Sequence, residues 1–127
     1  MRNQLLPLAF LFLLSFITSC TNNSKNSVVG KWRPIEVDRK FMVSYGISNE
    51  DLKNMLEKES IEFTKDGKFI SYSPHDSSRG IYNYDEKEKS LITAVEDGRT
   101  VNYSIELLQK NKMVLSSEFG KMTLKRN

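Results

Sequence analysis

The side chains that most often carry catalysis are few in this chain and do not converge on one site. The sequence has one histidine, His75, and one cysteine, Cys20. His75 stands beside Asp76 in a turn-rich stretch, which favours a solvated loop, and a zinc site needs three or four such ligands. The two serines that follow have no second histidine to activate a hydroxyl as a nucleophile. We therefore expect no metal, no cofactor and no enzymatic activity.

Three tyrosines offer the more informative chemistry. Tyr82 and Tyr84 are two residues apart, so they share one face of a strand, and Tyr103 is expected to face the same interior from a later strand. A tyrosine combines an apolar ring with a hydroxyl, which suits a ligand of mixed character. We therefore predict Tyr82, Tyr84 and Tyr103 as candidate ligand-binding residues. The alternative is that these rings only pack in the core and at its rim.

The elements that would position these tyrosines alternate between apolar and polar residues from Val28 onward. Residues 101–107 show the clearest alternation, which is typical of a half-buried strand. Asp66-Gly67 and Asp97-Gly98 supply the positive φ angle that tight hairpin turns need. Pro34 marks a bulge or an edge position in the first strand. Eight short strands at regular spacing predict an all-β antiparallel barrel or sandwich.

One segment between the first two strands breaks this pattern. Ser48 is a good N-cap, and the acidic Glu50 and Asp51 favour the first turn of a helix. Leu52, Met55 and Leu56 then form one apolar stripe, so we predict one short helix over residues 49–58. The connection that carries this helix is long and apolar at residues 41–45. It is expected either to cover a ligand or to plug one end of the barrel.

The N-terminal residues have the pattern of a targeting signal. Arg2 precedes an apolar run from Leu5 to Ile17, which as a helix reaches about 20 Å, short of the ~30 Å core of a membrane. This run, followed by Thr18-Ser19-Cys20, resembles a bacterial lipoprotein signal peptide with its lipobox. The resemblance implies removal of residues 1–19 and acylation of Cys20. The alternatives are an uncleaved signal anchor and a secretory signal that is cut elsewhere.

Residues 20–27 are expected to form the lipidated cysteine and a polar, flexible tether. Several acyl chains on one residue anchor a protein stably in a membrane. Residue 21 is Thr and not Asp, which, by resemblance to bacterial lipoproteins, favours the outer membrane. No acidic residue follows Cys20 directly, so the periplasmic face is expected. The predicted location is therefore the bacterial cell envelope, with the membrane as a partner through acylated Cys20.

The charge and cysteine counts restrict the remaining partners. Loss of Arg2 with the signal segment lowers the net charge from +3 to +2, and the basic residues are scattered along the chain. Clustered basic and aromatic residues are typical of nucleic-acid binding, so no nucleic-acid partner is expected. A single cysteine excludes an intramolecular disulfide, so the apolar core alone must stabilise one domain over residues 28–127.

The motifs of this domain resemble those of lipocalins. Gly30-Lys31-Trp32 on the first strand is similar to their G-x-W signature, and Arg126 shares a strand face with Met122 and Leu124. The resemblance covers residues 28–127 and includes the lipocalin-like domains of bacterial lipoproteins. It implies a small eight-stranded antiparallel up-and-down barrel in which Arg126 packs over Trp32. It also implies a small, often hydrophobic ligand.

Two features of this chain depart from ordinary lipocalins. The chain is shorter, and it carries the predicted helix between the first two strands. Large side chains would then compete with a ligand for the interior; those concerned are Phe63, Phe69, Tyr103 and Met122. Two functions follow as hypotheses. The first is an anchored envelope lipoprotein that binds a small hydrophobic or amphipathic molecule, and the second is a closed-core interaction module, inhibitor or accessory subunit with an unknown protein partner.

Overall fold

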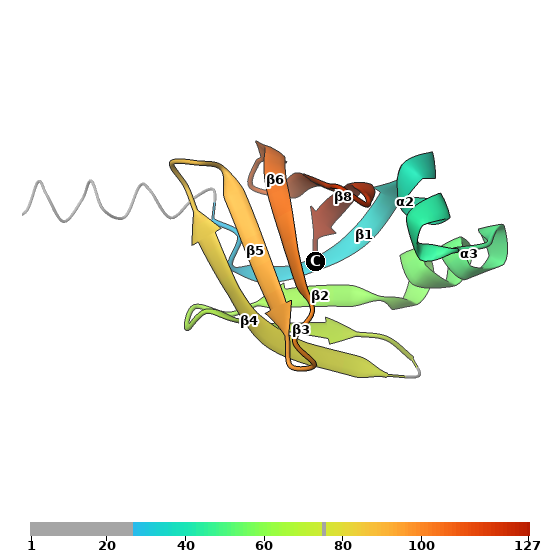
Figure 1. The fold of residues 1–127 in the computed structure, drawn as a ribbon, viewed down its shortest axis with the longest axis horizontal. Coiled ribbons are helices and arrows are strands. Elements are labelled where there is room, and N and C mark those ends of the chain that lie inside the picture. Colours follow the sequence, from blue (N-terminus) through green and yellow to red (C-terminus); the bar gives the residue numbers. More distant parts are fainter. Residues whose placement is uncertain (1–26, 75) are drawn as a thin grey trace, which may run out of the picture.

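The computed structural model describes residues 27–74 and 76–127. Eight strands follow one another around a closed barrel, and β1 completes the ring by pairing with β8 (Figure 1). The strands are β1 Gly30–Val37, β2 Ser60–Phe63, β3 Lys68–Tyr72, β4 Ser77–Asp85, β5 Ser90–Val95, β6 Thr100–Leu108, β7 Lys112–Ser117 and β8 Gly120–Arg126. All neighbouring pairs are antiparallel. The predicted all-β, eight-stranded antiparallel up-and-down barrel is confirmed.

Several predictions fall outside the described residues. These are the signal segment 1–19, the lipidated Cys20, the tether up to residue 26 and the loop position of His75. Ser27, the last residue of the expected tether, is described, and it is bonded to the barrel: its carbonyl accepts a hydrogen bond from Arg126 Nη2 at 2.9 Å. Ser27 is therefore in contact with the barrel through Arg126.

The local signals for turns and for the bulge are confirmed. Gly67 and Gly98 have φ angles of 85° and 97°, as the Asp-Gly turns require. The register of β1 against β8 shifts between Pro34 and Glu36, so the proline lies at a bulge. These turns and this bulge set which residues of each strand face the interior.

Two helices lie between β1 and β2, where one was predicted. The helix α3, Asn49–Lys58, begins with a capping box in which Ser48 Oγ accepts from the Asp51 N–H at 3.1 Å. The second helix, α2, spans Arg39–Tyr45. Its sequence is rich in aromatic and β-branched residues, which have low helix propensity, so composition did not indicate it. The N-cap Asp38 and the left-handed Gly46 were its only signals.

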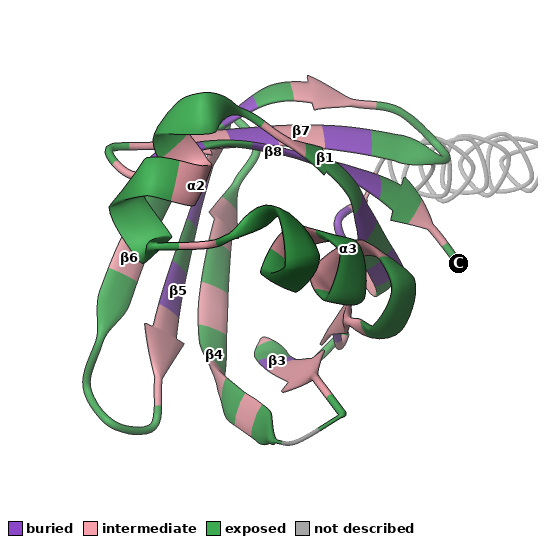
Figure 2. Ribbon diagram, turned by 90° about the vertical axis from the view of Figure 1, so that its right-hand side faces the viewer, coloured by how far each residue is buried: buried purple, intermediate pink, exposed green. Residues whose placement is uncertain are grey.

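The two ends of the barrel differ. Six large side chains are fully buried, and they are Val28, Trp32, Leu91, Met113, Leu115 and Leu124. Val28 and Trp32 lie where the chain enters the barrel. The helices lie at the opposite end (Figure 1). Figure 2 looks onto that end, and neither helix has a buried residue. The helices therefore add no buried residue to the core, which the strands and Val28 supply.

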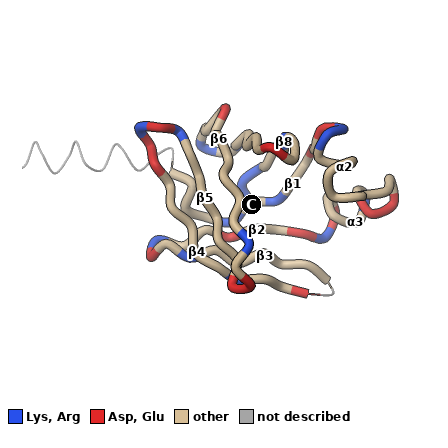
Figure 3. The backbone as a smooth tube through the Cα atoms, viewed as in Figure 1, with Lys and Arg blue, Asp and Glu red and all other residues tan. Residues whose placement is uncertain are grey.

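The charged residues show no concentration along the fold. Lys and Arg alternate with Asp and Glu at the turns, most clearly in the turn between β4 and β5 (Figure 3). Within the described residues, no helix is both long enough and apolar enough to cross a membrane. The scattered pattern read from the sequence is thus preserved in three dimensions.

Candidate functional site

The entry end of the barrel is sealed by Trp32 and Arg126. Trp32 is fully buried, and its indole N–H donates to the carbonyl of Val28 at 2.9 Å. The Arg126 guanidinium lies over the Trp32 ring, 4.1 Å from its centroid. It also donates to the carbonyls of Ser27, Val29 and Lys110. The packing of Arg126 on Trp32 that was expected from the resemblance is present.

Gly30 makes this contact sterically feasible. Its φ angle is 137°, and a Cβ atom at this position would collide with Nη1 of Arg126. Burial lowers the pKa of the Arg126 guanidinium, although an arginine stays charged at neutral pH. Gly30, Trp32 and Arg126 therefore form a structural seal. The three guanidinium nitrogens of Arg126 each donate to a backbone carbonyl.

A cavity of about 370 Å³ opens at the other end, inside the barrel. Ligand pockets usually measure ~300–1,000 Å³, so this one suits a small molecule. Its apolar lining comes mainly from β2, β3, β5, β6, β7 and β8. The apolar residues are Ile61, Phe63, Phe69, Val95, Val101, Leu115, Phe119 and Met122. The large side chains expected to compete for the interior thus line the cavity without filling it.

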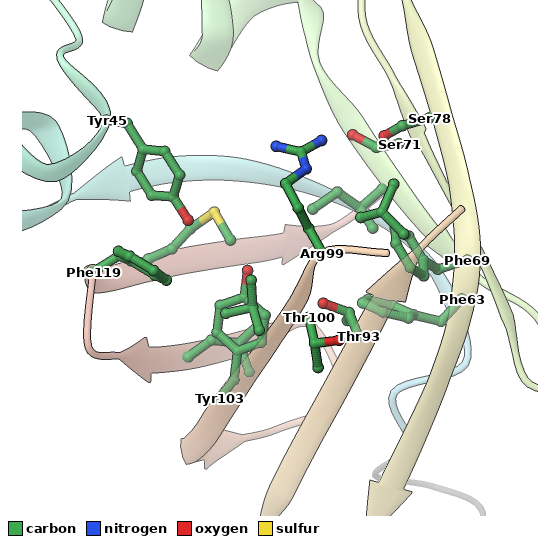
Figure 4. Close-up of a pocket in the computed structure, with 15 residues that line it drawn as sticks. Tyr45, Phe63, Phe69, Ser71, Ser78, Thr93, Arg99, Thr100, Tyr103 and Phe119 are labelled. Atoms are coloured by element: carbon green, nitrogen blue, oxygen red, sulfur yellow. The ribbon is translucent and has the colours of Figure 1, made fainter. Parts of the chain in front are cut away.

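Hydroxyl groups face the same cavity. They belong to Tyr45, Ser71, Ser78, Thr93, Thr100 and Tyr103 (Figure 4). Tyr103 is the most enclosed of the three tyrosines named from the sequence, and burial raises its pKa to about 12. Its phenol therefore stays protonated at neutral pH and offers a hydrogen-bond donor and an acceptor to the cavity.

Arg99 stands at the mouth and is the one charged residue among those that line the cavity. Its Nε donates to Asp97 Oδ2 at 2.8 Å, and its side chain is 75% exposed. The Arg99 backbone N–H and guanidinium hold the pKa of Asp97 below its usual range. In Figure 4 the guanidinium lies between Tyr45 on one side and Ser71 and Ser78 on the other.

The helix α2 supplies Tyr45 and is clamped to β8. Asp38 Oδ1 accepts from the backbone N–H groups of Phe41 at 2.9 Å and Lys121 at 3.0 Å. A Cβ atom on Gly120 would collide with the backbone of Phe41, so the helix lies directly on the strand. The Tyr45 ring then lies 5.5 Å from that of Phe119, centroid to centroid. Together these two rings form one side of the mouth.

The three tyrosines named from the sequence have different positions in the structure. Tyr103 lines the cavity, whereas Tyr82 and Tyr84 do not. Tyr82 packs edge-on against Phe63 at 5.0 Å, and its hydroxyl donates to the carbonyl of Thr64. Tyr84 is half-buried against the core nearer the sealed end. Tyr82 and Tyr84 lie on the predicted inner face of β4. On that face it is Ser78, nearer the helical end, that lines the cavity.

Tyr45, Arg99 and Phe119 are cavity residues that sequence reasoning missed. Each lies at or beside a turn, where no alternation indicates the direction of a side chain. The apolar stretch 41–45 was the one available signal for Tyr45.

Within the described residues, no three His, Cys, Asp or Glu side chains lie close enough together to hold a metal ion.

Comparison with known proteins gives matches in structure alone. No protein-family model matches the chain, and no curated protein sequence matches it. Three solved structures from Bacteroides are similar over most of the chain. The likeness is one of fold.

The first is a DUF4847 family protein from Bacteroides vulgatus, with a TM-score of 0.59, 12% identity, and coverage of 82% of this chain and 96% of that one. The second is an uncharacterized protein from Bacteroides eggerthii, with a TM-score of 0.59, 14% identity, and coverage of 80% and 100%. The third, from Bacteroides uniformis, has a TM-score of 0.55, 16% identity, and coverage of 82% and 96%. At these sequence identities the comparison supports the barrel fold and gives no information on function.

Proposed function

We propose that this protein is a lipid-anchored lipoprotein of the bacterial envelope whose lipocalin-like barrel binds a small hydrophobic or amphipathic molecule. The observation that carries the proposal is the cavity of about 370 Å³ at the helical end, with its apolar wall and hydroxyl groups. A closed-core interaction module would have no need of such a space. The cavity therefore favours ligand binding over that alternative.

The anchoring part of the proposal rests on the lipobox and agrees with where the chain enters the barrel. Ser27 is bonded at the sealed end through its carbonyl and Arg126. An acylated Cys20 would therefore attach to the domain at the end opposite the cavity. We place the protein in the outer membrane, facing the periplasm, because Thr21 follows the cysteine and no acidic residue lies close behind it.

Native mass spectrometry of protein purified from its own membranes tests the binding function. We expect the wild-type protein to carry a small molecule in addition to its acyl chains. Val101→Phe, which adds a ring to the cavity wall, should lose this adduct. Asn102→Phe adds the same ring one residue later, on the exposed face of β6, and should retain it.

Two outcomes would contradict the binding function. One is a wild-type protein without any non-covalent adduct, and the other is an adduct that survives in Val101→Phe as well as in Asn102→Phe. Both variants should first give the far-ultraviolet circular dichroism of the wild type. Filling an existing cavity needs less rearrangement than overpacking a full core, so Val101→Phe is expected to fold.

A further inference from the structure

We infer that the cavity selects an organic acid, with the carboxylate at Arg99 and a compact apolar body in the barrel. This inference rests on the proposed binding function and names the chemical class of its ligand. The cavity has an apolar floor and one charged group, and that group is a cation at the mouth. A ligand that satisfies both parts is apolar at one end and anionic at the other.

The geometry of Arg99 leaves room for such a group. Asp97 bonds to the Nε edge of the guanidinium, at 2.8 Å. Within the described residues, neither Nη1 nor Nη2 makes a hydrogen bond to the protein. An arginine has five N–H donors, so several stay available after the bond to Asp97. A carboxylate can accept from two of them at once, which is the strongest pairing an arginine makes.

The surrounding groups complete a set of donors. Ser71 and Ser78 lie on one side of the guanidinium and Tyr45 on the other (Figure 4). Their hydroxyls can each donate to an anion, whereas an ammonium group would meet Arg99 with like charge. Asp97 does not line the cavity, so its carboxylate is directed to Arg99 and not to a ligand. The mouth therefore favours an anion over a neutral or cationic head group.

The size of the cavity restricts the body of the ligand. A volume of about 370 Å³ lies near the lower limit of ordinary ligand pockets. Phe63 and Phe69 both line the cavity, and their ring centroids are 6.4 Å apart. A cavity of this volume suits a compact body better than a long extended chain. A compact, ring-containing acid fits this space better.

Three probes with one rigid body and different head groups test the inference. They are 2-naphthoate, 2-naphthylmethanol and 2-naphthylmethylamine, measured by equilibrium dialysis. The protein is expressed from the full-length chain and held in phosphatidylcholine nanodiscs, with empty nanodiscs as the blank. We expect the acid to bind at least fivefold more tightly than the alcohol, and the amine to bind most weakly.

Variants assign this preference to Arg99. Arg99→Gln should lower the ratio of acid affinity to alcohol affinity at least fivefold, and Arg99→Lys should retain most of it. Arg79→Gln is the matched control, because it removes the same charge from an exposed position on the outer face of β4 and should leave the ratio unchanged. Equal binding of acid and alcohol, or a ratio that Arg99→Gln does not change, would overturn the inference and leave the binding function intact. Failure of all three probes to bind would also overturn the inference, and the native mass spectra of the wild type and Val101→Phe decide separately whether the binding function fails with it.

Discussion

Arg126 holds together parts of the chain that are far apart in sequence. Its guanidinium joins the last strand to the residues before β1, through Ser27 and Val29, and to the turn between β6 and β7, through Lys110. The planar fork of an arginine can meet several carbonyls while its face stacks on an aromatic ring, which a lysine cannot do. In a barrel without a disulfide, this one side chain closes the entry end over Trp32.

At this scale we predict that Trp32→Ala lowers the free energy of unfolding by about 3–5 kcal/mol, the usual cost of truncating a large aromatic side chain in a core. Trp32 is fully buried, and its loss also removes the surface on which Arg126 stacks. Urea denaturation followed by circular dichroism measures the change. Ile81→Ala, at a side chain that is 62% exposed, should change stability by less than about 0.5 kcal/mol. An unchanged stability of Trp32→Ala would show that the ring does not support the core.

Among the elements, α2 depends most on contacts distant in sequence. It has only seven residues and no fully buried one, so its position depends on the bonds of Asp38 to β8 and on the packing of Phe41 against the core. Asp38 serves both as the N-cap of this helix and as the acceptor for the Lys121 N–H. The position of Tyr45 at the cavity mouth follows from this clamp.

The Asp38 clamp should make stability depend on pH. The backbone N–H groups of Lys121 and Phe41 hold the pKa of Asp38 below its usual value, so the ionised group stabilises the fold above about pH 5. This contribution is lost as the pH falls through the native pKa. We expect Asp38→Asn, which retains a helix-capping side chain, to be less stable than the wild type at pH 6 and to approach it at pH 2.5. Urea denaturation at both values tests this, and a constant difference between the two proteins would contradict it.

A side chain at Gly120 should displace α2 from β8. Its φ angle is 132°, and an added Cβ atom would collide with the backbone of Phe41. Gly98 provides a matched control because its φ angle is also positive, at 97°, while nothing lies within 4 Å of a Cβ atom there. We expect Gly120→Ala to be more destabilising than Gly98→Ala by about 1–3 kcal/mol, as overpacking of a tight contact is. Thermal unfolding of both variants measures the difference. Equal melting temperatures of Gly120→Ala and Gly98→Ala would show that α2 moves away from β8 without loss of stability.

Over the whole molecule, the barrel has a sealed end and an open end with different roles. The described chain begins at the sealed end, and the cavity lies at the end that carries both helices (Figure 1). If Cys20 is acylated, as proposed, the membrane attachment and the cavity mouth are on opposite sides of the domain.

The anchor can be tested independently of the cavity. We predict that Cys20→Ser leaves an unacylated or uncleaved product, because under the proposal the Cys20 thiol is the group that is acylated. Membrane fractionation and intact-mass measurement of the protein test this. Ser19→Ala preserves a small residue before the cysteine and should be processed normally. A Cys20→Ser product with the mass and location of a mature lipoprotein would refute the lipobox prediction.

The residues of each strand determined much of this fold by themselves. Alternation along residues 101–107, the Asp-Gly turns and the bulge at Pro34 are local signals, and they predicted antiparallel strands in a barrel or a sandwich. The helix α3 was likewise predicted from local residues, since its capping box lies within four consecutive residues. The up-and-down barrel itself was implied by the resemblance to lipocalins. The packing of Arg126 on Trp32 was implied by the same resemblance, and the structure contains it.

The cavity and its mouth were decided by the tertiary structure alone. A cavity is the small difference between the space that eight tilted strands enclose and the volume of the side chains within it, and no local pattern encodes that difference. Arg99, Tyr45 and Phe119 come from three separate connections, and they meet only because the barrel closes and Asp38 clamps α2 to β8. Tyr82 lies on the inner face of β4, as predicted, but its ring packs against Phe63 and does not line the cavity. Sequence therefore determined the strands and their faces, while closure of the barrel determined which side chains surround the space for a ligand.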